Sequence, residues 1–183
     1  MRPVIIALCT LTMLATLSGP AAAEEYRCTG TVGDRTLDNV RVPSGRTCTL
    51  NGTLVKGTIR IGNDARLFAD NTRVIGNIQS EGFRNVTVED SRVGGSVQLV
   101  QGGRADLRRT RINADILFDD NGRWNIARRN EVGGNIQAFQ NTGGVQIRRN
   151  QVDGNLQCKA NDPAPIGDDN RVGGNKEDQC RRM

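Results

Sequence analysis

Short runs in which every second residue is apolar recur along the chain, separated by bends rich in glycine and polar residues. Examples are Ile59-x-Ile61, Trp124-x-Ile126 and Val145-x-Ile147. This alternation is typical of half-buried β-strands of three to five residues. The i, i+3, i+4 spacing of apolar residues that a helix needs does not occur in these repeats. The pattern therefore predicts an all-β protein.

A five-residue motif of the form Val-x-Gly-Asn-Ile gives the repeat a fixed phase. Its seven copies begin at Val55, Val74, Val93, Ile112, Val132, Val152 and Val172. Successive copies are 19, 19, 19, 20, 20 and 20 residues apart, which suffices for three short strands and their bends. Glycine in the third position is expected to supply the backbone freedom of a bend. The sequence predicts a right-handed, single-stranded parallel β-helix of about seven coils.

Columns of polar residues keep the same phase as the motif. One column lies two positions before it and contains Thr53, Thr72, Ser91, Thr110, Asn130, Asn150 and Asn170. A second lies three positions after its first residue and contains Thr58, Asn77, Ser96, Asp115, Asn135, Asn155 and Asn175. A third contains Gln79, Gln98, Gln137 and Gln157. Side chains stacked about 4.8 Å apart can bond along a column, so we expect structural ladders, with ligand contact as the alternative for the asparagines.

The first residues have the features of a secretory signal peptide. A short positive start is followed by an apolar run and by Ala21-Ala22-Ala23, a small-residue cleavage site. We expect cleavage near Ala23, which leaves residues 24–183 as one β-helix domain, secreted or periplasmic. No later stretch is long and apolar enough to span a bilayer, so no membrane span is expected.

Four cysteines follow the predicted cleavage site. Cys28 and Cys48 are one coil apart, as are Cys158 and Cys180, and neighbouring coils fall within the Cα separation that a disulfide tolerates. A bond from Cys48 to Cys158 would have to cross about five coils. The sequence predicts the disulfides Cys28–Cys48 and Cys158–Cys180, one at each end of the stack. Both ends are expected to stop rather than to join a neighbour, which favours a monomer.

Residues 28–180 resemble secreted right-handed parallel β-helix proteins of the pectate-lyase-like superfamily. The Val-x-Gly-Asn-Ile units, such as Val132-Gly133-Gly134-Asn135-Ile136, are also similar to the repeats of bactofilins, bacterial polymer-forming β-helices. Pectate lyases and polygalacturonases imply longer helices with long loops around a substrate cleft. Here the loops are mostly two to four residues long, and no catalytic motif of those enzymes can be matched. Bactofilins lack signal peptides and disulfides, so the resemblance implies the fold but not their cytoskeletal role.

Composition removes several classes of function. The 183 residues include no histidine, which excludes His-based catalytic triads and His metal sites. Aromatic residues make up only 3%, so Val, Ile and Leu must fill the core. Trp124, the single tryptophan, is expected to pack inside the coils. No catalytic residue, metal or cofactor is predicted.

The chain carries a formal net charge of +5, and its arginines recur in phase with the coils. The candidate polyanion-binding residues are Arg73, Arg92, Arg108, Arg109, Arg111, Arg128, Arg129, Arg148 and Arg149. Guanidinium groups match sulfate, phosphate and carboxylate, so acidic polysaccharide, lipopolysaccharide phosphates or extracellular DNA are candidate partners. Nucleic acid fits less well because no aromatic residues interleave these arginines. The alternative is a solvated face, neutralised by Glu89, Asp106 and Glu131, that prevents aggregation.

The fourth motif copy departs from the pattern. Asp115, Asp119 and Asp120 could offer oxygen ligands to calcium or serve a small polysaccharide-active lyase or hydrolase. Neither the spacing nor a nearby base supports this, and an irregular turn is the preferred interpretation. The sequence thus predicts an exported, non-catalytic β-helix protein with a structural or binding role at the cell envelope, which contacts anionic polymers through its arginines; the alternative is the polysaccharide-active enzyme.

Overall fold

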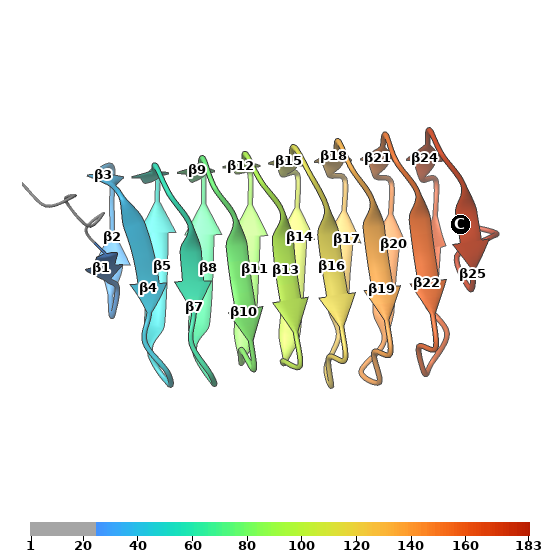
Figure 1. Cartoon of the computed structure of the whole chain (residues 1–183), viewed down its shortest axis with the longest axis horizontal. Helices are drawn as coiled ribbons and strands as arrows, with labels where there is room; N and C mark the ends of the chain where they lie inside the picture. The colour runs from blue at the N-terminus through green and yellow to red at the C-terminus, as the bar shows by residue number, and fades with distance from the viewer. Residues whose placement is uncertain (1–24) are drawn as a thin grey trace, which may run out of the picture.

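Three parallel sheets run along the length of the protein, as the computed structural model shows for residues 25–183 (Figure 1). The chain passes through sheet A, sheet B and sheet C in turn and then begins the next coil. Strands that are neighbours in a sheet are therefore three strands apart along the chain. This arrangement is a parallel β-solenoid, which confirms the predicted all-β coil stack. The predicted signal peptide lies outside the described residues.

The strands are short and recur with the same order in every coil. Sheet A contains β1 (Glu25–Arg27), β4 (Asn39–Val42), β7 (Ile59–Ile61), β10 (Ile78–Glu81), β13 (Val97–Val100), β16 (Ile116–Asp119), β19 (Ile136–Phe139), β22 (Leu156–Lys159) and β25 (Lys176–Asp178). Sheet B contains β2 (Thr31–Val32), β5 (Thr47–Asn51), β8 (Arg66–Asp70), β11 (Asn85–Glu89), β14 (Arg104–Arg108), β17 (Asn125–Arg128), β20 (Val145–Arg148) and β23 (Ile166–Asp168). Sheet C contains β3 (Thr36–Leu37), β6 (Leu54–Val55), β9 (Arg73–Val74), β12 (Arg92–Val93), β15 (Arg111–Ile112), β18 (Glu131–Val132), β21 (Gln151–Val152) and β24 (Arg171–Val172).

The stack has more coils than the sequence predicted. Sheets A, B and C hold nine, eight and eight strands, so the described chain makes about eight turns and adds one strand to sheet A. The prediction of about seven was one turn short. The additional turn is residues 25–37, which form β1, β2 and β3 without carrying the Val-x-Gly motif.

Aliphatic side chains fill the inside of the coils. In β13, Val97 and Leu99 are buried while Gln98 between them is exposed, as period-two alternation requires. The same positions repeat in register from coil to coil, so the interior is a set of continuous Val, Ile and Leu columns. Each such side chain stabilises the fold by about 1.5–3 kcal/mol on burial. Phe83 and Phe118 are the aromatic residues buried in this core.

Both predicted asparagine columns form hydrogen-bonded ladders. At the bend from sheet B to sheet C, the Oδ1 of Asn150 accepts from the backbone N of Asn130 at 2.9 Å, and the Oδ1 of Asn170 accepts from the backbone N of Asn150 at 3.0 Å. The Nδ2 of Asn150 also donates to the carbonyl O of Ala127 at 2.9 Å. The column that includes Thr58 forms an equivalent ladder at the bend from sheet C to sheet A. The polar groups of these side chains are already hydrogen-bonded within the fold, which favours a structural role for them.

The glycine of the repeat motif allows a close approach between coils. A Cβ on Gly95 would lie 2.1 Å from the Oδ1 of Asn77, the ladder residue of the preceding coil. The motif glycines do not have positive φ, so the expectation that they supply backbone freedom is wrong. The fourth copy carries Ala114, and there the ladder residue of the preceding coil is Ser96, whose side chain is shorter. Glycine is therefore needed where a longer ladder side chain covers the position.

Each of the last three coils contains one inserted residue, at the bend from sheet A to sheet B. Asp119 at the end of β16 pairs with Val100, and Asn125 at the start of β17 pairs with Ala105. The sequence separation of the second pair is one residue larger than that of the first. The lengthening of the repeat therefore arises between Asp119 and Asn125. The two later coils keep the longer bend, because their strands pair at the same larger separation.

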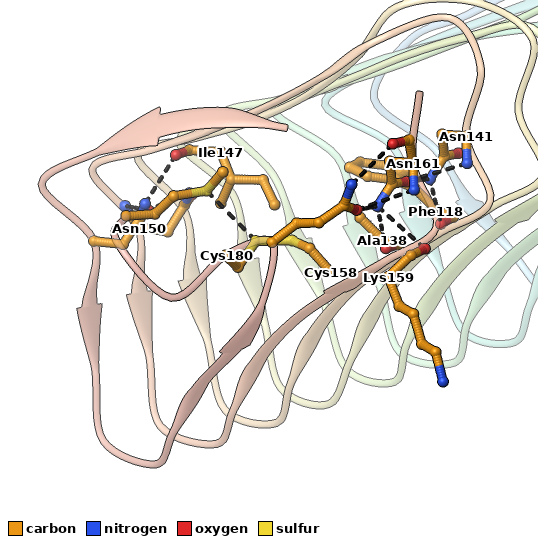
Figure 2. Close-up of a disulfide and its surroundings, with 12 residues drawn as sticks. Phe118, Ala138, Asn141, Ile147, Asn150, Cys158, Lys159, Asn161 and Cys180 are labelled. Carbon is orange, nitrogen blue, oxygen red and sulfur yellow. Dashed lines mark hydrogen bonds between the residues drawn. A yellow bond between two sulfur atoms is a disulfide. The ribbon is translucent and has the colours of Figure 1, made fainter. Parts of the chain in front are cut away.

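The longer bends contain a third ladder, which the sequence analysis missed. Its members are Asn121, Asn141 and Asn161. Figure 2 shows Asn141, whose Nδ2 donates to the carbonyl O of Phe118 at 3.0 Å. The Oδ1 of Asn161 accepts from the backbone N of Asn141 at 3.1 Å. Each lengthened bend thus contains a buried asparagine, and the side chains of these asparagines hydrogen-bond the backbone of neighbouring coils.

The insertion also shifts the inward-facing positions of the sixth coil by one residue. Asn125 is buried in register with Val145, so the predicted inward alternation of Trp124-x-Ile126 is wrong. Trp124 lies half-buried at the surface against Gly144, where a Cβ would be 2.1 Å from the indole ring. The Nδ2 of Asn125 donates to the carbonyl O of Arg123 at 2.8 Å, and among the described residues its Oδ1 has no hydrogen-bond partner.

Disulfides join neighbouring coils near both ends, as the sequence predicted. Cys28 and Cys48 have a Cα–Cα distance of 5.4 Å, and Cys158 and Cys180 have one of 5.3 Å. Figure 2 shows the second bond next to the ladder residue Asn161. Two structural disulfides are typical of proteins that mature in an oxidising compartment.

The glutamine column on the outer face of sheet A forms the expected polar ladder. The Nε2 of Gln79 donates to Oε1 of Gln98 at 3.0 Å, and the Nε2 of Gln137 donates to Oε1 of Gln157 at 2.9 Å. Leu117 occupies the same column between these two pairs and interrupts it.

Candidate functional site

Six of the nine candidate arginines lie where sheet B bends into sheet C. Arg108, Arg128 and Arg148 end β14, β17 and β20 and pair in register. Each is followed by an arginine in the left-handed region, with φ of 47°, 56° and 56° for Arg109, Arg129 and Arg149. This turn directs the chain inward to the buried Thr and Asn ladder, and both arginines of each pair remain outside the core.

The remaining three arginines begin strands of sheet C. Arg73, Arg92 and Arg111 are the first residues of β9, β12 and β15 and pair in register with one another. The two groups flank the same buried ladder and overlap in the fifth coil, which contains both Arg109 and Arg111. We call these nine residues together the arginine edge.

A groove lies where the two groups of arginines meet. We call it the edge groove, and it is lined by Asp90, Ser91, Arg92, Arg109, Thr110, Arg111, Arg129 and Glu131. Four of these eight residues are arginines and two are acids. The groove therefore combines several guanidinium groups with local partial neutralisation.

Carboxylates pair with five of the nine arginines. The ion pairs are Arg108–Asp106, Arg109 with Asp90 and Glu89, Arg111–Glu131, Arg148–Asp168 and Arg149–Asp169. Arg109 binds both carboxylate oxygens of Asp90, at 2.7 and 2.8 Å. Glu89, Asp106 and Glu131 are the acids that the solvated-face alternative named, and each of them forms one of these ion pairs.

The other four arginines have no carboxylate oxygen within 4.0 Å in the part of the chain that the structure describes. They are Arg73, Arg92, Arg128 and Arg129. Arg73, Arg92 and Arg129 are exposed, and Arg128 is half-buried. Arg92 and Arg129 line the edge groove. Two of the four unpaired arginines of the arginine edge thus lie in this groove.

The ion pair between Arg109 and Asp90 shifts the pKa of both groups. The hydrogen bonds from Arg109 hold the pKa of Asp90 below its ordinary value. Those to Asp90 and Glu89 raise the pKa of Arg109. Both side chains are substantially exposed, and solvent-exposed ion pairs contribute little to stability. An anionic partner could therefore exchange with these carboxylates at small cost to the fold.

The three aspartates of the fourth motif copy do not form one site. Asp115 precedes β16 and belongs to a ladder, where its Oδ1 accepts from the backbone N of Asn135 at 2.7 Å. Asp119 ends β16, and four strand residues span about 13 Å. Burial and the neighbouring charge of Asp120 raise the pKa of Asp119, although a backbone hydrogen bond from Asp120 opposes them. No cluster of three metal-ligating side chains occurs within residues 25–183.

A second depression lies on the outer face of sheet B, away from the arginine edge. We call it the sheet B groove, and it is lined by Arg66, Phe68, Arg84, Asn85, Thr87, Arg104, Asp106, Arg123 and Trp124. The sequence did not predict this groove, because the alternation around Trp124 placed that residue in the interior. The alternation Leu67-x-Ala69 could have indicated it, since it places Phe68 on the outer face.

Comparisons with family models, curated proteins and solved structures found no match to this chain. The resemblance to pectate-lyase-like and bactofilin repeats therefore holds for the architecture of stacked coils and has no support from a family match. In residues 25–183 the structure contains no helix of the length and apolarity that crossing a bilayer requires.

Proposed function

We propose that this protein is an exported, non-catalytic β-solenoid that binds anionic polymers at the cell envelope through the arginine edge. The observation that carries the proposal is the edge groove, where Arg92 and Arg129 have no carboxylate partner among residues 25–183 and lie beside Arg109 and Arg111. A polyanion that lies along the solenoid axis meets one such arginine position about every 4.8 Å. Repeating charge of this kind suits a repeating ligand better than a single ion.

Export is the second part of the proposal. Residues 1–23 act as a signal peptide that is removed near Ala23, and the two disulfides support maturation in an oxidising compartment. The rigid stack then presents the edge without a hinge, because every coil is bonded to the next through three sheets and polar ladders.

Retention on an immobilised sulfated polysaccharide tests the role of the arginine edge. We expect the double variant Arg128→Ser/Arg129→Ser of the oxidised protein to bind about ten-fold more weakly near 0.15 M salt. Two fewer ion contacts should also lower the slope of log affinity against log salt by about 2. The measurement is the salt concentration at elution, together with affinities from titration at several salt concentrations.

The matched control removes two charges from a different sheet. Arg41 and Arg60 are exposed on sheet A, where both lie near Glu25. Replacing both by serine gives the same net charge as the test variant. If the two double variants lose retention equally, total charge rather than the arginine edge governs binding, and the proposal is wrong.

A further inference from the structure

The sheet B groove combines aromatic rings with guanidinium groups on the outer face of sheet B. Phe68 in β8 is 38% exposed and shares an outward column with Thr49 and Thr87. The adjacent outward column contains Arg66, Asn85 and Arg104 in register. An aromatic residue at an exposed position flanked by threonines is not required by the fold, so its burial against a ligand is a plain explanation of its presence.

The inserted residue of the sixth coil forms one end of this groove. Arg123 and Trp124 lie in the longer bend between β16 and β17, while the other lining residues come from the third to fifth coils, which have the shorter bend. One edge of the indole ring packs over Gly144 of the seventh coil. Trp124 therefore has a fixed position at the step where the smaller coils meet the larger ones.

The charge of the groove is positive. Arg84 pairs with Asp64 at 3.6 Å and Arg104 with Asp106 at 3.3 Å, whereas no carboxylate oxygen within residues 25–183 lies within 4.0 Å of Arg66 or Arg123. Within the same described residues, the single cation–π contact is that of Arg35 with Tyr26. Among these residues, therefore, no cation is stacked on the ring of Phe68 or Trp124.

We propose that the sheet B groove is a second binding site, which takes an acidic oligosaccharide with sugar rings on Phe68 and Trp124 and its carboxylate or sulfate groups on Arg66 and Arg123. The apolar face of a sugar ring packs against an aromatic face, and a guanidinium fork matches a carboxylate or sulfate. The two aromatic residues are three coils apart, about 14 Å along the axis, which suits a short run of sugar units.

The groove suits a saccharide better than single-stranded nucleic acid. Nucleic-acid channels offer successive aromatic rings to successive bases, whereas here polar residues of two coils lie between the two rings. They are Asn85 and Thr87 in the fourth coil and Arg104 and Asp106 in the fifth. Amide and hydroxyl groups are partners for sugar hydroxyls.

Fluorescence tests this site directly because Trp124 is the single tryptophan of the chain. The oxidised protein is titrated with an oligogalacturonate, with a neutral oligosaccharide of equal length and with oligothymidylate, and the emission of Trp124 is recorded. We expect saturable change with the acidic sugar, and at least ten-fold weaker affinity for the neutral sugar. An unchanged emission with the acidic sugar, or equal or tighter binding of oligothymidylate, would overturn the proposal.

Two substitutions taken from neighbouring coils keep the test independent of folding. Phe68→Thr copies Thr49 and Thr87, and Arg66→Thr copies Thr47, which is in register with it. Each should weaken the binding of the acidic sugar about ten-fold, through lost ring burial or a lost charged hydrogen bond. Arg60→Gln on sheet A, which copies Gln79, is the charge control and should leave the affinity unchanged. Equal affinity of Phe68→Thr and the unmodified protein would contradict the site.

This inference goes beyond the arginine edge, and the two can fail separately. The variant Arg128→Ser/Arg129→Ser should leave the Trp124 titration with a short acidic sugar unchanged. The same variant should lose retention on the long polymer. If Arg128→Ser/Arg129→Ser abolishes the emission change of Trp124, the groove is not a separate site and the inference is wrong.

Discussion

Replacing Asn150 with alanine should lower the free energy of unfolding by about 3 kcal/mol, because the change leaves buried backbone groups without partners. The amide of Asn150 accepts from the backbone N of Asn130 and donates to the carbonyl O of Ala127. It also donates to the Oδ1 of Asn170, and its side chain is only 1% exposed. Urea unfolding of the oxidised protein measures the loss.

Two further variants separate the ladder from the general effect of a substitution. Asn150→Thr should lose clearly less than Asn150→Ala, since Thr110 occupies the same column and its hydroxyl donates to the carbonyl O of Arg108 at 2.9 Å. Gln151→Ala, at the exposed neighbouring position, should stay within about 0.5 kcal/mol of the unmodified protein. A loss for Asn150→Ala no larger than that for Gln151→Ala would show that the ladder adds nothing to stability.

Replacing Gly95 with alanine should destabilise the protein by about 2 kcal/mol through overpacking. The new Cβ would lie 2.1 Å from the Oδ1 of Asn77, which accepts from the backbone N of Ser96 at 2.8 Å. The Asn77 side chain therefore has to give up this hydrogen bond in order to move. Thermal or urea unfolding measures the effect.

A second substitution should restore much of this loss. The natural pair Ser96 and Ala114 has a short ladder residue next to an alanine, so Asn77→Ser in combination with Gly95→Ala reproduces it one coil earlier. The double variant should be more stable than Gly95→Ala alone, which a double-mutant cycle would detect as coupling of about 1 kcal/mol or more. Simple additivity of the two losses would contradict the proposed contact.

Most of the fold could be predicted from the sequence because each coil repeats one phase. Seven motif copies fixed which residues become vertical neighbours, and that was sufficient to pair Cys28 with Cys48 and Cys158 with Cys180. The first turn was missed because it builds its strands without the motif. The role of the motif glycine was misassigned because the close approach of Asn77 to Gly95 is a contact between coils, which one repeat alone does not reveal.

The errors near Trp124 have a single physical origin. The sequence showed that the repeat lengthens by one residue after the fourth motif copy, but not at which of the three bends the additional residue lies. Side chains of a strand alternate between the two faces of the sheet. If the additional residue is placed at the wrong bend, the strand that follows is shifted by one residue, and its inward and outward side chains are interchanged. Trp124 therefore lies at the surface and Asn125 in the interior, which is the reverse of the prediction.

The positions of the arginines could be predicted from the sequence, whereas their ion-pair partners could be predicted only in part. Asp106 is close in sequence to Arg108 and was foreseen. Asp90 and Asp168 lie one coil away from their arginine partners, and such contacts depend on side-chain directions at two coils. Only the three-dimensional structure shows which arginines have no acidic partner among the described residues.

The number of coils between Phe68 and Trp124 sets the length of the sheet B groove. Phe68 lies in the third coil and Trp124 in the sixth, and neighbouring coils are about 4.8 Å apart. Adding one whole coil between them would lengthen the groove by about 4.8 Å, whereas lengthening a single bend would leave the spacing along the axis unchanged. A solenoid of this kind can therefore change the size of the ligand that spans both rings by duplicating one repeat.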